Sequence, residues 1–142
     1  SKEIMVYADD FYIDQVLTNY ITNAIKYSIE INGEKVVRIE NEILADKNKV
    51  IIKIFNTFEE FSKDDMARIW NRFYKADESR NRDKGGSGIG LSLVKAIMNN
   101  YGNGYGVKNV AGGVEFWFEL DLIKWYLYVI IVLKWRGDED AK

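Results

Sequence analysis

The chain of 142 residues lacks histidine, cysteine and proline altogether. Without cysteine it can form neither a disulfide framework nor a thiolate metal site, and the absence of histidine also argues against a zinc site. Oxygen ligands for magnesium are still available. Any chemical step that needs an imidazole, as a base or as a phosphate acceptor, must therefore take it from another domain or polypeptide.

The charge and the apolar content are those of an ordinary globular domain. The formal net charge is −2, the apolar fraction is 47% and the charged fraction is 30%, which is typical of one folded domain with a core. So small a net charge gives no bulk attraction to nucleic acid. The first residues, Ser-Lys-Glu, do not resemble a signal peptide, so we expect a cytosolic location.

The longest apolar run lies at residues 125–133, between Lys124 and Lys134. A membrane-spanning helix needs roughly 20 apolar residues, so we expect no direct membrane insertion. Three interpretations stay open for this run: an additional buried element, a surface for self-association or for another chain, and an altered carboxyl terminus. We therefore expect a domain at 1–121 and an extension of unknown role at 122–142.

Three segments show the apolar spacing of helices. The first, at 11–28, follows Asp9 and Asp10, which can cap a helix. The third begins near Gly88 and runs to about Asn100. Ser62 can cap the second helix, and four apolar residues are expected on one of its faces: Met66, Ile69, Trp70 and Phe73.

Further segments have the alternation or the apolar content of strands. Residues 45–48 are expected to join two of them into a hairpin. Together with the helices, this order predicts an α+β fold, a two-layer sandwich in which about three helices cover one face of a mixed sheet. The expected strands are residues 4–8, 36–44, 50–55, 105–110 and 114–120.

The first predicted helix carries polar side chains at helical spacing. Asn19 and Asn23 lie one turn apart, and Lys26 and Tyr27 follow one turn later. Asparagine is a poor helix former, so two on one face need partners. Amide oxygens can ligate magnesium, amide nitrogens can donate to phosphate, and lysine supplies a positive charge. The alternative is a water-bonded polar face without a ligand.

A glycine run precedes the third predicted helix. Backbone N–H groups of such a run can turn towards an anion, and the helix amino terminus favours negative charge. No strand comes before it, so it is neither a dinucleotide fingerprint nor a Walker loop. Arg80 and Arg82, in the charged stretch 77–84, can reach a phosphate, although a hinge and a solvated charge run are the alternatives. The candidate residues of the run are Gly86, Ser87, Gly88, Ile89, Gly90 and Leu91.

Asn56 follows the predicted strand at 50–55. A side-chain oxygen at a strand end can accept a hydrogen bond from an adenine amino group. The alternative is a turn-forming asparagine.

In this order, three motifs resemble those of the catalytic ATP-binding domain of sensor histidine kinases, a superfamily shared with DNA gyrase B, mismatch-repair ATPases and the large heat-shock chaperones. Residues 17–28, Leu-Thr-Asn-Tyr-Ile-Thr-Asn-Ala-Ile-Lys-Tyr-Ser, resemble the N box. Residues 70–77, Trp-Asn-Arg-Phe-Tyr-Lys-Ala-Asp, resemble the F box, and residues 86–91 resemble the second glycine box. The resemblance covers about residues 4–121.

The resemblance implies a domain that binds ATP with Mg²⁺ and donates the γ-phosphoryl group. By it, Asn23 ligates the magnesium, Asn19 assists through water or phosphate, Lys26 contacts phosphate and Tyr27 lies against the nucleotide. The glycines of the second box wrap the phosphates, and the loop at 77–87 is a mobile ATP lid. The implied partners are a histidine-bearing dimerisation domain and a response regulator, in a sensor anchored to the membrane.

One stretch departs from the family pattern. The family's first glycine box reads Asp-x-Gly-x-Gly, whereas residues 56–60 read Asn-Thr-Phe-Glu-Glu. Asn56 replaces the adenine-binding acid, and an amide is a weaker acceptor than a carboxylate. Phe58 adds bulk in place of a glycine. We therefore expect weakened nucleotide affinity or a reshaped pocket, and a degenerate docking module is the alternative function. Hydrolysing relatives carry a catalytic glutamate where this chain has Asn19, which argues against hydrolysis.

Overall fold

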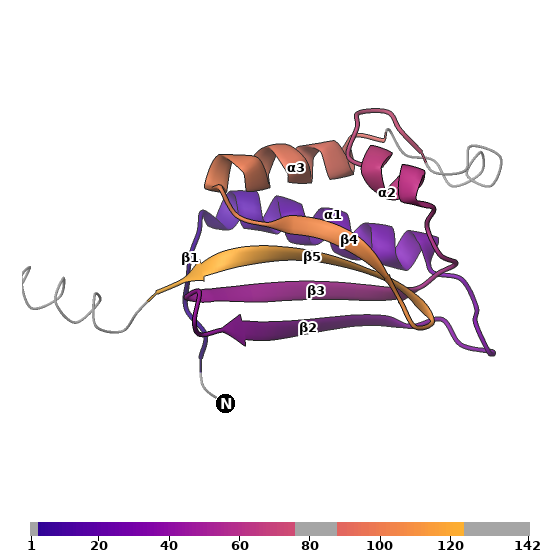
Figure 1. The fold of residues 1–142 in the computed structure, drawn as a ribbon, viewed down its shortest axis with the longest axis horizontal. Coiled ribbons are helices and arrows are strands. Elements are labelled where there is room, and N and C mark those ends of the chain that lie inside the picture. Colours follow the sequence, from indigo (N-terminus) through magenta and orange to yellow (C-terminus); the bar gives the residue numbers. More distant parts are fainter. Residues whose placement is uncertain (1–2, 76–87, 124–142) are drawn as a thin grey trace, which may run out of the picture.

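A five-stranded sheet with helices on one face forms the body of the molecule (Figure 1). The computed structural model describes residues 3–75 and 88–123. Its elements are β1 (Val6–Tyr7), α1 (Asp10–Tyr27), β2 (Val37–Leu44), β3 (Lys49–Thr57), α2 (Lys63–Arg68), α3 (Gly90–Tyr101), β4 (Tyr105–Val110) and β5 (Gly113–Leu122).

β5 is the strand around which the sheet is assembled. On one side it pairs with β3 from Lys49↔Asp121 to Thr57↔Gly113, and β3 pairs in turn with β2. On its other side β5 pairs with two strands in succession along its length. β4 pairs with Gly113–Phe118, and β1 pairs with Asp121 and Leu122. The α+β two-layer architecture is confirmed. We expected a mixed sheet. Each pairing between the described strands is instead antiparallel.

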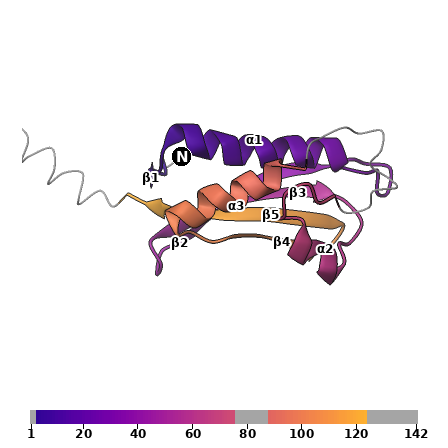
Figure 2. The ribbon, with the colours of Figure 1, turned by 90° about the horizontal axis from the view of Figure 1, so that it is seen from above.

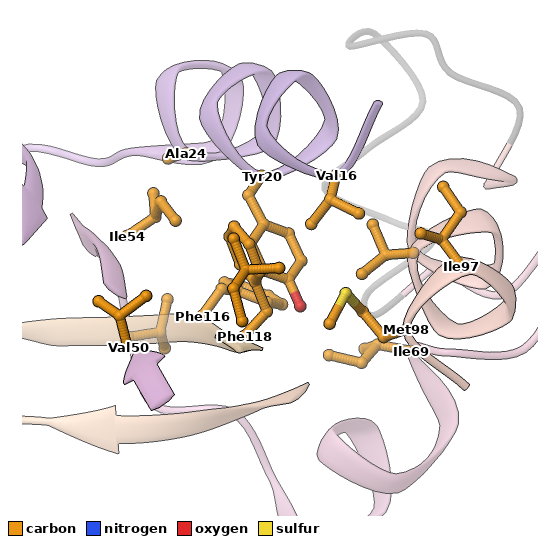
Figure 3. Close-up of a cluster of buried hydrophobic side chains, with 13 residues drawn as sticks. Val16, Tyr20, Ala24, Val50, Ile54, Ile69, Ile97, Met98, Phe116 and Phe118 are labelled. Atoms are coloured by element: carbon orange, nitrogen blue, oxygen red, sulfur yellow. The ribbon is translucent and has the colours of Figure 1, made fainter. Parts of the chain in front are cut away.

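The core fills the space between the sheet and the two longer helices. α1 and α3 lie on the same side of the sheet, and the view from above shows them beside each other (Figures 1 and 2). Tyr20 extends from α1 towards Phe116 and Phe118 of β5 (Figure 3), with ring centroids 5.3 and 5.9 Å away. Tyr20 and Phe118 are fully buried, so these rings join the two layers.

The ends of the helices follow the capping residues in the sequence. The Asp9 carboxylate accepts hydrogen bonds from the backbone N–H groups of Phe11 (3.0 Å) and Tyr12 (3.4 Å), which confirms the predicted N-cap. Ser62 caps α2 by accepting from the Asp65 N–H at 3.0 Å. Gly102 ends α3 in the left-handed conformation (φ 68°).

The expected extent of the second helix is wrong. α2 ends at Arg68, and Phe73 is 67% exposed with φ 63°, so it does not share a helix face with Ile69 and Trp70. Ile69 is nevertheless buried, and Trp70 packs edge-to-face on Tyr105 with ring centroids 5.0 Å apart. Beyond α2, Phe73 has a left-handed backbone conformation and its N–H donates to the Gly88 carbonyl at 2.9 Å.

The first residue of the extension predicted at 122–142, Leu122, is the last residue of β5. β5 continues to Leu122, and Val6 of β1 pairs with it. The apolar run at 125–133 lies outside the described residues, so its role stays open. Of the helices within 3–75 and 88–123, none combines the length and apolar character that a membrane crossing requires.

Candidate functional site

One face of α1 borders a cavity of ≈ 260 Å³. Asn19, Asn23, Lys26 and Tyr27 all line it, because positions separated by three, four, seven and eight residues lie on the same side of a helix. The neighbouring stripe of α1, which includes Tyr20, faces the sheet and is buried. The sequence thus gives α1 an apolar stripe for the core and a polar stripe for the cavity.

The two asparagines of this polar stripe differ in their hydrogen bonding. The Asn19 side-chain nitrogen donates to the Gln15 carbonyl at 2.7 Å, so among the described residues only its oxygen and one N–H are uncommitted. The Asn23 side chain makes no hydrogen bond with the described residues. Its amide is therefore available to a ligand in the cavity. Lys26 is adjacent, and its ammonium lies 5.1 Å from the centroid of the Tyr27 ring.

The start of α3 forms the facing wall. Gly88, Gly90 and Leu91 line the cavity together with the α1 residues. At Gly90, a Cβ atom would lie 2.3 Å from Asn19 Oδ1, so only glycine lets α3 begin so close to α1. Gly88 has φ +66°, and a Cβ there would meet the Phe73 Cα at 2.9 Å. The predicted amide pair and part of the predicted glycine run therefore border the same cavity.

Seven further lining residues, mostly apolar and from four parts of the chain, are called here the apolar end. Asn56 is its one polar side chain; it is 2% exposed, and its Nδ2 donates to the Thr57 carbonyl at 3.2 Å. The α1 side, with Gly88 and Gly90, is the polar end. The apolar end is lined by Asn56, Phe58, Phe61, Ile69, Leu91, Val114 and Phe116.

Aromatic rings fix the shape of the apolar end. The centroids of Phe58 and Phe61 are 5.0 Å apart, and Phe61 meets Phe116 edge-to-face at 6.4 Å. The Phe61 backbone is held in place by Asn109, which accepts from its N–H and donates to its carbonyl, both at 2.9 Å. These contacts hold the aromatic lining of the apolar end in place without a ligand.

Tyr74 and Lys75 line the same cavity and were not among the predicted site residues. The Tyr74 hydroxyl donates to Asp65 Oδ1 at 2.6 Å, and Ser62 donates to Asp65 Oδ2 at 2.7 Å. These hydrogen bonds hold the pKa of the Asp65 carboxyl below its ordinary value, and the bond from Tyr74 has the largest effect. The same carboxylate raises the pKa of Tyr74. The pair ties the cavity wall to α2.

The remaining predicted site residues divide into two groups. Ile89 is 37% exposed and does not line the cavity. Arg80, Arg82, Gly86 and Ser87 lie outside the described residues, as does the loop at 77–87 in which the lid was expected.

The side chains around the cavity are compatible with a magnesium ion that takes most of its oxygen ligands from substrate phosphates and water. Within residues 3–75 and 88–123, no group of three or more His, Cys, Asp or Glu side chains gathers to hold a metal. Magnesium takes oxygen ligands and is commonly bound by few protein oxygens together with substrate phosphates and water. The uncommitted amide of Asn23 is compatible with that arrangement.

Comparison with known proteins identifies the class. Residues 8–124 match the family described as histidine kinase-, DNA gyrase B-, and HSP90-like ATPases, and the chain belongs to this family. Among curated proteins it is 36% identical over 118 residues to the sensor histidine kinase GacS of Pseudomonas protegens, and 34% identical over 111 residues to the sensor histidine kinase YkoH of Bacillus subtilis. These matches cover 82% and 78% of the chain, but only 13% and 23% of the relatives.

Solved structures show the same fold. Full-length ShkA in complex with AMPPNP matches with a TM-score of 0.70 and 27% identity, over 87% of this chain and 24% of that chain. The catalytic domain of histidine kinase ThkA matches with a TM-score of 0.66 and 26% identity, over 82% of this chain and 69% of that chain. The predicted membership of the histidine kinase ATPase family is thus confirmed.

Proposed function

We propose that this chain binds ATP with Mg²⁺ in the cavity between α1 and α3, and that it donates the γ-phosphoryl group to a histidine on a separate dimerisation domain. The observation that carries the proposal is that the free amide of Asn23 shares a cavity with Gly88 and Gly90. The chain has no histidine, so the phosphate acceptor must lie elsewhere. ShkA, whose fold is similar, has been solved in complex with the ATP analogue AMPPNP.

The two ends of the cavity suggest how the nucleotide lies. The flat adenine ring suits the apolar end, beside Asn56. The triphosphate suits the polar end, where Lys26 supplies positive charge and the start of α3 supplies backbone N–H groups. Asn23 would hold the magnesium, which neutralises phosphate charge when bound. Asn19 would act through water or phosphate, and Tyr27 would lie against the nucleotide. The chain then acts by positioning the phosphates for in-line transfer.

The wider assembly belongs to the same proposal. Arg80, Arg82, Gly86 and Ser87 would contact the phosphates from a lid. The partners would be the histidine-bearing domain and a response regulator, in a membrane-anchored sensor with this domain in the cytosol. A structure of ThkA with the response regulator TrrA is among the matches, at 24% identity. Because the chain spans only 13% of GacS, these statements concern a longer parent protein.

Calorimetric titration with Mg-ATP tests the binding step. We expect Asn23→Ala to weaken Mg-dependent ATP binding by about a hundredfold, since it removes the proposed metal ligand. Asn41→Ala is the matched control, because Asn41 is an exposed asparagine on β2, away from the cavity. Equal ATP binding by the Asn23 variant and the wild type would remove Asn23 from this role.

A degenerate docking module is the second candidate function. It is favoured by the presence of Asn56 and Phe58 at the apolar end, where the family has an acid and a glycine. Under this alternative, a well-folded sample gives no detectable heat with Mg-ATP. Under the leading proposal the isolated chain binds ATP, stays unlabelled by γ-labelled ATP, and labels the parent's histidine-bearing domain when that domain is added.

A further inference from the structure

The apolar end offers an entering base one polar side chain. Of the described residues that line it, Asn56 alone carries side-chain hydrogen-bonding groups. Asn56 is 2% exposed, and its one hydrogen bond with the described residues runs from Nδ2 to the Thr57 carbonyl. Its Oδ1 and its second N–H are uncommitted. The identity of the base bound here therefore depends on what this amide can pair with.

Where the 6-position of the purine faces the side chain, as proposed here for adenine, an amide can pair with either purine, whereas a carboxylate pairs only with adenine. Adenine presents an amino donor beside a ring-nitrogen acceptor, and guanine presents a carbonyl acceptor beside a ring N–H donor. An asparagine side chain has one acceptor and two donors, so it meets the first edge in one orientation and the second after a half-turn of its amide. An ionised aspartate only accepts, so a guanine seated in the same pose as adenine would have its carbonyl unpaired and facing a negative charge.

The Thr57 carbonyl decides which orientation the amide prefers. With Nδ2 directed at that carbonyl (3.2 Å), Oδ1 is the group left to accept from the amino group of adenine. The Thr57 oxygen also accepts from the Ile29 N–H at 3.0 Å, so it keeps a partner when the amide turns over. The turned amide loses this neutral hydrogen bond and brings its oxygen up to the Thr57 oxygen, and we assign the two costs together a factor of about ten in binding.

We propose that Asn56 makes the cavity accept guanine as well as adenine nucleotides, with adenine preferred by about tenfold. This inference rests on the proposed function, because it assumes that a purine nucleotide occupies the cavity. In this proposal Asn56 determines which base is accepted, and the residues of the polar end bind the phosphates.

The test compares Mg-ATP and Mg-GTP titrations of the whole chain. For the wild type, we expect both nucleotides to bind within about tenfold of each other. For Asn56→Asp, we expect ATP binding to persist and the preference for ATP over GTP to rise to about a hundredfold or more, because a buried charged acceptor then faces the guanine carbonyl. Asn23→Ala is the control: it should weaken both nucleotides alike and leave their ratio unchanged.

Asn56→Ala keeps the test decisive if the aspartate variant does not fold. It removes the pairing partner of both bases, so the wild-type preference for adenine should disappear. A wild-type preference for ATP as strong as that of Asn56→Asp, or one that survives in Asn56→Ala, overturns the assignment. Absence of any nucleotide binding by folded wild-type protein instead refutes the proposed function itself, and the choice of base falls with it.

Discussion

The two ends of the cavity are built in opposite ways. The side chains of the polar end are local in sequence: Asn19, Asn23 and Lys26 share one face of α1 and need only the helix to bring them together, and only the glycines of the α3 start come from elsewhere. The apolar end is not local, since Asn56 and Phe116 come from strands far apart along the chain and meet only when β3 and β5 pair. A local motif can be identified from a sequence, whereas a cavity lining to which several strands contribute can be identified only once the fold is known.

The ends also differ in the forces that they offer a ligand. At the polar end, charge and uncommitted amides dominate, and the strength of such contacts depends on ions. At the apolar end, ring surface and a single buried amide dominate, and this contribution depends little on salt. Each end can therefore be weakened separately, and such experiments test whether the division is real.

Removal of magnesium should have the largest effect and should act on the polar end alone. In the proposed complex the metal neutralises phosphate charge, so we expect EDTA to weaken ATP binding by roughly a hundredfold, or about 2.7 kcal/mol. Adenosine has no phosphate, and its weaker binding at the apolar end should not change. Calorimetric or fluorescence titrations with and without magnesium measure both. A matching loss of adenosine binding would contradict the division into two ends.

An alanine at Gly90 should have a smaller effect, because it disturbs the polar end through a neighbour. Its Cβ would lie 2.3 Å from Asn19 Oδ1, so the amide must move away from its present position. We expect Gly90→Ala to weaken Mg-ATP binding by about tenfold, of the order seen when one oriented hydrogen-bonding group is lost. ATP titration of the purified variant measures this.

A double-mutant cycle separates this contact from a general loss of fold. Asn19→Ala removes the atom that the new methyl group would meet, so Gly90→Ala should cost little further affinity in that background. Additive losses in the double variant would mean that Gly90 acts without Asn19, for example through the geometry of the α3 start.

Elements whose signals are local were predicted well. The first helix, expected at 11–28, spans Asp10–Tyr27, and Asp9 caps it as predicted. The predicted face of the second helix was wrong at Phe73, which lies beyond the end of α2 and whose N–H donates to the distant Gly88 carbonyl. Such a pairing between segments leaves no local pattern.

The apolar end could not be recognised from the sequence beyond Asn56, Phe58 and Leu91. Phe61, Val114 and Phe116 have the same residue types as the core, and Phe116 also packs against Tyr20 in the core at 5.3 Å. Apolar periodicity shows that such side chains are buried. It does not tell a residue that lines a cavity from one that fills the core.

The smallest predicted effect concerns the wall that carries Tyr74. Its bond to Asp65 is the first cause of the lowered pKa of that carboxyl. A pKa that is lowered in the folded state adds stability above the ordinary Asp value of 3.8, and this stability is lost as the pH falls through the folded-state pKa. Tyr74→Phe should therefore be less stable than wild type at neutral pH, by a difference that shrinks in acid.

Urea unfolding at a series of pH values measures this difference. Tyr12→Phe is the matched control, because Tyr12 is an exposed tyrosine whose hydroxyl makes no hydrogen bond within the described residues; its small effect should not vary with pH. Adenosine binding gives a second readout, since Tyr74 lines the cavity without belonging to the apolar end and its loss should change that binding little. A deficit of Tyr74→Phe that stayed constant down to strong acid would mean that the hydroxyl stabilises the wall without acting through the Asp65 carboxylate.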